Sequence, residues 1–129
     1  MTVSAAFLVL DPPLDRLAAL LELIRPVVHE AIVVVDDRTR PETVDVMSTW
    51  PNVKLIPFGW VDDFAAARNA ALPHCTGDWV LHLDPDEIPS RAMLSMRSSW
   101  WSNSFRGFVA DGRIWSTGIW LIWFMCVTL

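Results

Sequence analysis

Apolar positions follow two distinct patterns between residues 3 and 83. Short, nearly continuous apolar runs are typical of strands that are buried on both faces. Four such runs predict strands at residues 3–10, 31–35, 53–57 and 79–83. The stretches between them favour helices, because apolar residues recur at helical spacing or because alanine is abundant. These helices are expected at residues 14–25, 41–50 and 63–72.

The order of these elements predicts an α/β fold. Strands that alternate with helices favour a mostly parallel, Rossmann-like sheet with helices on its faces. Turn residues lie where this order requires them, since Pro12-Pro13 ends the first strand and Pro41 opens the second helix. Asp62 or Asp63 is placed to cap the third helix.

The last third of the chain has a different character, so we divide the sequence into residues 1–95 and an irregular, Trp-rich, apolar tail at residues 96–129. Residues 114–129 carry no charge, and this run falls short of the roughly 20 apolar residues that a membrane-spanning helix needs. The tail is compatible with a buried strand pair, a membrane-surface segment, or a truncated or frame-shifted reading frame. We favour the last, because the first 90 residues are regular and the tail is not.

Composition excludes several classes of protein. The chain has 129 residues, is 53% hydrophobic and carries a net charge of −5, which argues against a general nucleic-acid binder. Cys75 and Cys126 lack metal-ligand spacing, and no signal peptide is evident, so two free thiols in a reducing compartment are expected. We expect a cytoplasmic protein, with membrane association through the tail as an open alternative.

Acidic residues follow two of the predicted strands. Asp36-Asp37 follows residues 31–35, and Asp84-Pro85-Asp86-Glu87 follows residues 79–83. The carboxyl ends of parallel strands lie at one edge of a sheet, where open α/β proteins bind their ligands. An Asp-x-Asp turn presents hard oxygen ligands that suit Mg²⁺ or Mn²⁺, and such an ion in turn suits a diphosphate. The ordinary alternative is a polar turn, because Asp and Pro are common turn residues.

Three blocks of sequence together resemble a known family. They are IVVVDD at residues 32–37, WVDDFAAARN at residues 60–69 and TGDWVLHLDPDE at residues 76–87. In this order and spacing they resemble the family-2 glycosyltransferases of the GT-A fold, and the resemblance covers about residues 1–95. It implies a truncated GT-A domain that binds a nucleotide-diphospho-sugar donor, a divalent Mn²⁺ or Mg²⁺ ion, and an inverting transfer of the sugar.

The resemblance also implies roles for individual residues. Asp36 resembles the acid that accepts a hydrogen bond from the donor base, and Asp37 is its neighbour. Arg68 resembles the basic residue near the donor nucleotide, and a guanidinium suits phosphate or base-edge contacts. Asp84 and Asp86 resemble the Asp-x-Asp pair. Asp86 would ligate the metal, and Asp84 would contact the ribose or a metal-bound water.

The chain departs from the family pattern in three places. Leu10-Asp11-Pro12-Pro13 stands at the end of the first strand, where many relatives carry a Lys-Asn-Glu-like turn. Arg38-Thr39-Arg40 follows the first acidic pair, where relatives carry Gly-Ser-Thr. Relatives supply their catalytic base from a later segment, but Asp111 is the only acid after Glu87 and matches no family motif. No catalytic residue is therefore assigned. His82 is expected to be a satisfied structural histidine, and Trp60 is expected in the core.

Two other functions remain as alternatives. The first is a non-catalytic remnant that binds a nucleotide sugar. The second, more distant one is a receiver-like phospho-acceptor domain, because Asp36-Asp37 and Asp84 mimic its acidic pair and phospho-acceptor. Receivers carry the pair after their first strand and need a lysine late in the chain, whereas Lys54 precedes Asp84.

Overall fold

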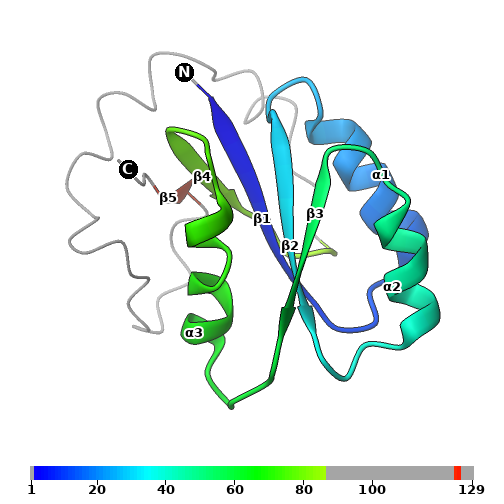
Figure 1. Ribbon diagram of the computed structural model, residues 1–129. Coiled ribbons are helices and arrows are strands. Elements are labelled where there is room, and N and C mark those ends of the chain that lie inside the picture. Colours follow the sequence, from blue (N-terminus) through cyan, green and yellow to red (C-terminus); the bar gives the residue numbers. More distant parts are fainter. Residues whose placement is uncertain (1, 87–123, 126–129) are drawn as a thin grey trace.

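The computed structural model describes residues 2–86 and 124–125, which form one sheet with helices on both faces (Figure 1). The strands, in the sheet order β3-β2-β1-β4-β5, are β1 (Val3–Val9), β2 (Glu30–Asp36), β3 (Val53–Phe58), β4 (Trp79–His82) and β5 (Phe124–Met125). The helices are α1 (Leu14–Ile24), α2 (Pro41–Ser48), α3 (Phe64–Asn69) and the 3₁₀ helix η1 (Leu72–His74). Strands β1 to β4 pair in parallel, and β5 pairs antiparallel with β4.

This architecture confirms the predicted α/β fold with its mostly parallel sheet. Each expected strand and helix is present, and the ends differ by only a few residues. The largest difference is at the third helix, where α3 ends at Asn69 and the chain continues as η1 instead of reaching Leu72 as one helix. Pro73 lacks a backbone N–H donor, which disfavours continuous α-helical hydrogen bonding through this turn.

The core has two layers because α1 and α2 cover one face of the sheet and α3 covers the other (Figure 1). Strand β2 shows the consequence. Val33 faces the α1–α2 layer with Leu17, while Ile32 and Val34 face the α3 layer with Leu72. A strand that is buried on both faces needs apolar residues at every position, which explains why the predicted strands are continuous rather than alternating runs.

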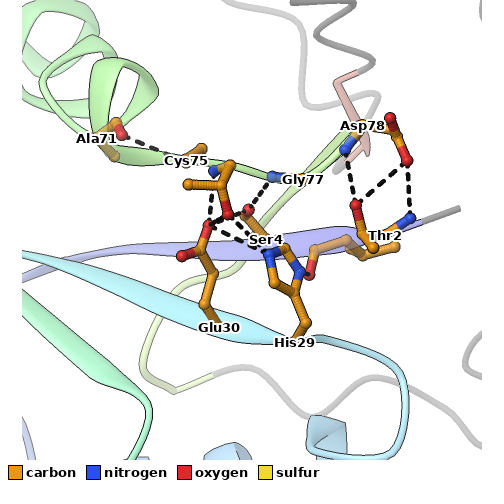
Figure 2. A network of polar contacts seen from close by, with 10 residues as sticks. Thr2, Ser4, His29, Glu30, Ala71, Cys75, Gly77 and Asp78 are labelled. Atoms are coloured by element: carbon orange, nitrogen blue, oxygen red, sulfur yellow. Dashed lines mark hydrogen bonds and ion pairs between the residues drawn. The ribbon is translucent and has the colours of Figure 1, made fainter.

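A polar clamp joins the amino ends of β1, β2 and β4, opposite the acidic edge. The Glu30 carboxylate accepts hydrogen bonds from Ser4 Oγ at 2.6 Å, from the Thr76 backbone N–H at 2.6 Å and from Thr76 Oγ1 at 2.9 Å. The Gly77 N–H donates to Ser4 Oγ at 2.9 Å. Figure 2 shows Ser4, Glu30 and Gly77 converging from three separate segments of the chain. The clamp therefore stabilises the position of β4 beside β1.

We expect Glu30→Gln to destabilise the fold at neutral pH by about 1.5–3 kcal/mol, the usual value of hydrogen bonds to a charged group. Burial raises the pKa of Glu30, but the hydrogen bonds from Ser4 and Thr76 outweigh it and hold the pKa below its ordinary value of 4.5. A lowered pKa stabilises the folded state above the unfolded value and loses that effect as the pH falls through the folded value. Urea unfolding at several acidic pH values should show less acid sensitivity in Glu30→Gln than in the wild type.

The control for this prediction is Glu42→Gln, at an exposed position in the first turn of α2. This change removes the same charge without touching the clamp. Equal acid sensitivity of the wild type and Glu30→Gln would contradict the assigned role of Glu30.

Most of the expected tail at residues 96–129 lies outside the described residues, and so does Asp111. The described part of the tail is β5. The division of the chain near residue 95 stays a prediction. Among the described residues, no helix combines the length and apolar character needed to cross a membrane.

Candidate functional site

The predicted acids lie at the carboxyl edge of the sheet, as expected. Asp36 is the last residue of β2, and Asp84 follows the end of β4 by two residues. Strand β1 lies between β2 and β4, so these acids flank its carboxyl end without belonging to adjacent strands. A cavity of about 260 Å³ lies elsewhere, where Ala18 of α1 approaches Ala31 and Val53 at the amino ends of β2 and β3. We place the candidate site at the acidic edge, because the carboxylates that are predicted to bind a ligand lie there and not at the cavity.

Asp36 is a buried carboxylate that is held by Arg38. Its side chain is only 3% exposed. Arg38 donates to Oδ1 from its backbone N–H and from Nε, both at 2.9 Å, and to Oδ2 from Nη2 at 2.6 Å. These side-chain hydrogen bonds outweigh burial and lower the pKa of Asp36 to about 2. Asp36 is therefore a carboxylate anion at every physiological pH.

An aromatic pair lies next to this carboxylate, with Trp60 on the loop between β3 and α3 and Phe64 at the start of α3. The Arg38 guanidinium lies over the Trp60 ring, 5.2 Å from its centroid, which is within cation–π range. Trp60 meets Phe64 edge to face with centroids 4.9 Å apart, and its backbone N–H donates to Asp37 Oδ1 at 3.5 Å. The expectation of a core Trp60 is wrong, because Trp60 is only partly buried and contacts Arg38 at this edge.

Helix α3 brings Arg68 to Asp84. Asp63 caps the helix by accepting from the Ala66 N–H at 3.1 Å, as the sequence predicts. Arg68, in the last turn, donates from Nη2 to Asp84 Oδ1 at 3.3 Å, and both side chains are more than a third exposed. Such an exposed pair adds little stability, so its placement at the sheet edge does not follow from a need to stabilise the fold.

His82 is the last residue of β4, two positions before Asp84, and its ring is neutral at physiological pH. Burial disfavours the charged ring and the nearby Arg68 charge adds to this, so the pKa of His82 falls to about 4. Its Nε2 is buried without a hydrogen-bond partner among the described residues. The expectation of a fully satisfied structural histidine therefore does not hold within this part of the chain.

The residues that could hold a divalent metal at this edge are Asp84 and the exposed Asp86. Within residues 2–86 and 124–125, no three His, Cys, Asp or Glu side chains gather in a way that would hold a metal ion. Mg²⁺ commonly binds through one or two carboxylates and completes its shell with substrate phosphates and water. A pair of hard-oxygen ligands at the edge of the sheet fits that mode, although Arg68 already shares one oxygen of Asp84.

The contact that sequence reasoning missed is the pairing of Arg38 with Asp36. The signal was present, because Arg38 stands where the resembling family carries a small residue, two positions after the acid. What the sequence did not reveal is that the turn directs this side chain back onto Asp36 and against Trp60.

Comparison with known sequences identifies the family. The sequence model described as "Glycosyl transferase family 2" matches residues 14–124. The chain is 43% identical over 58 residues to a TPR repeat-containing protein of Synechococcus elongatus, which covers 45% of this chain and 14% of that protein. It is 31% identical over 61 residues to the glycosyltransferase SunS of Bacillus subtilis, covering 46% of this chain and 14% of SunS. The chain thus spans a small part of these relatives.

Solved structures share the fold. A structure of residues 1–349 of TarS from S. aureus superposes with a TM-score of 0.59 at 20% identity, over 74% of this chain and 31% of that one. Glucosyl-3-phosphoglycerate synthase from Mycobacterium tuberculosis in complex with UDP gives a TM-score of 0.52 at 18% identity, over 67% of this chain and 34% of that one. The same enzyme with Mn²⁺, UDP and glucosyl-3-phosphoglycerate gives 0.51.

These findings decide between the alternatives of fold and family. The four parallel strands and the flanking helices match the GT-A glycosyltransferase neighbours. A receiver domain is not supported, because the matching family model covers most of the chain and belongs to a different class. The chain belongs to glycosyltransferase family 2.

Proposed function

We propose that this chain binds a nucleotide-diphospho-sugar donor at the carboxyl edge of its sheet and serves an inverting sugar transfer. The observation that carries the proposal is the shared position of Asp36 and the Arg68–Asp84 pair at one edge of a family-2 fold. Open α/β sheets bind their ligands at this edge.

Asp36 and Asp37 form the base side of the proposed site. A buried, ionised carboxylate is a strong hydrogen-bond acceptor, and Asp36 meets this description. A ring N–H of the donor base is its proposed partner. Asp37 lies beside it and accepts from the backbone N–H of Trp60, and the Trp60 ring is the proposed stacking partner of the same base.

Arg68, Asp84 and Asp86 form the diphosphate side. Arg68 carries a guanidinium that suits a phosphate oxygen, and its present partner Asp84 is exposed enough to exchange it. Asp84 and Asp86 would hold Mn²⁺ or Mg²⁺, a proposal supported by the Mn²⁺ and UDP complex of the glucosyl-3-phosphoglycerate synthase. Such an ion neutralises charge that develops on the departing diphosphate. In a chain of net charge −5 it also offsets repulsion of the donor.

Donor binding without transfer is the second proposal. It is favoured because none of the acids that align with family motifs has the role of the catalytic base. The two proposals differ in one assay, the transfer or hydrolysis of a labelled nucleotide sugar, and they share the same donor site.

The base pocket provides the test of donor binding. Asp36→Asn replaces an acceptor oxygen by a donor, so the affinity for UDP and GDP, whose bases carry a ring N–H, should fall by roughly 10- to 100-fold. Calorimetric titration with UDP, GDP, CDP and ADP measures this loss. Asp45→Asn, at an exposed position of α2, removes the same charge away from the site and should leave binding unchanged. Unchanged binding by a folded Asp36→Asn would place the base elsewhere.

A further inference from the structure

The Asp36 carboxylate has little capacity left for a ligand. A carboxylate offers about four acceptor positions. Arg38 occupies three of them with its backbone N–H, Nε and Nη2, at 2.6 to 2.9 Å. Because the side chain of Asp36 is 3% exposed, the remaining position is also hard to reach from solvent. A base N–H therefore cannot bond Asp36 well while Arg38 stays in place.

Arg38 covers Asp36 from the solvent side. Its side chain is 54% exposed, in contrast to the buried acid beneath it. One face of the guanidinium rests on Trp60, which is itself supported by Phe64. The side chain thus lies between the two groups that a nucleobase would use, an acceptor for its N–H and an aromatic ring for its face.

The guanidinium also has other partners to move to. Asp37 and Asp62 both lie close enough to attract the charge of Arg38. A half-exposed arginine that exchanges one carboxylate for another keeps much of its electrostatic stabilisation. The arginine therefore stays paired when it leaves Asp36, and the N–H of an incoming base would replace part of the compensation that the buried carboxylate loses.

We propose that Arg38 is a specificity-determining residue that competes with the nucleobase for Asp36. In the donor-free protein its guanidinium fills the base pocket, and a base is bound through Asp36 only after the guanidinium has moved away. The inference rests on the proposed function, because it concerns the same donor site.

Competition lowers the apparent affinity by the fraction of molecules in which Asp36 is free. The cost falls on bases that must donate an N–H to a carboxylate. Uracil and guanine carry a ring N–H on their pairing edge, whereas cytosine and adenine present a ring nitrogen that accepts. A guanidinium that remains on Asp36 therefore discriminates against the first pair of bases and tolerates the second.

The test is Arg38→Ala, with UDP, GDP, CDP and ADP as probes in calorimetric titrations containing Mn²⁺. We expect roughly tenfold tighter binding of UDP and GDP, as for a competent fraction that rises from about a tenth to one. The gain for CDP and ADP should be clearly smaller. Arg38→Lys, which retains the charge but not the two-pronged contact, should lie between the wild type and the alanine variant.

Arg40→Ala is the matched control. It removes the same charge from the same loop, but Arg40 pairs with Asp11 and not with Asp36. Binding of all four probes by this variant should equal that of the wild type. Circular dichroism and urea unfolding verify that each variant is folded.

The outcomes separate the inference from the proposed function. Weaker binding of every nucleotide by Arg38→Ala would make Arg38 a direct donor contact and overturn the inference, while the donor site itself would stand. Unchanged affinities and an unchanged order of bases would overturn it as well. Failure of the wild type and all variants to bind any of the four nucleotides would reject both the inference and the proposed donor site.

Discussion

Replacing Asp86 by alanine should abolish the metal dependence of nucleoside diphosphate binding. Asp86 is the more exposed member of the proposed two-carboxylate donor set, so its loss leaves Asp84, one oxygen of which already accepts a hydrogen bond from Arg68. A divalent ion held by these carboxylates would offset their repulsion of the diphosphate. We therefore expect binding in Mn²⁺ to weaken on the order of 100-fold. Calorimetric titration of UDP with Mn²⁺, and again with a chelator, measures the effect.

The control is Asp45→Ala, which makes the same change in charge on the exposed face of α2. Its binding should keep the full response to Mn²⁺. If the wild type bound UDP equally well with Mn²⁺ and with the chelator, the assignment of Asp84 and Asp86 to a metal would be wrong. The role of Asp36 would be unaffected, since the base pocket involves no metal.

Gly77→Ala should produce the largest loss of stability among these variants. A Cβ atom at this position would lie 2.7 Å from the Ser4 backbone N, 2.9 Å from Ser4 Oγ and 3.0 Å from the Val3 carbonyl carbon. Two of these are backbone atoms of β1, so they cannot rotate away, and β4 must shift. The shift also breaks the hydrogen bond from Gly77 to Ser4. Overpacking and the lost hydrogen bond together predict a cost of about 3 kcal/mol.

Gly59→Ala is the matched comparison for this measurement. A Cβ at Gly59 would meet only Asp37 Oδ2, at an ordinary contact distance of 3.8 Å. Urea unfolding should therefore place Gly59→Ala within a few tenths of a kcal/mol of the wild type, as is usual for uncrowded positions. Similar unfolding midpoints for the two glycine variants would mean that β1 and β4 can move apart at Gly77 at little cost in stability.

The secondary structure and its order were readable from local patterns. Apolar runs without alternation predicted strands buried on both faces, and β2 with its fully buried Ile32, Val33 and Val34 confirms this. The cap at Asp63 and the position of Asp36 at the end of a parallel strand were predicted in the same way. These features depend on neighbours within a few positions, so the linear sequence contains nearly all of the information that determines them.

The lateral arrangement could not be read in this way. Strand β1 lies between β2 and β4, and the clamp joins Ser4, Glu30 and Gly77 from three distant segments. Such contacts follow from strand register, which a local pattern leaves undetermined. The same holds for Arg38: its spacing from Asp36 is local, but its position on the carboxylate and against Trp60 depends on where the loop after β3 returns. The sequence therefore predicted which acids lie at the edge of the sheet, whereas packing between distant segments decided that one of them is already occupied.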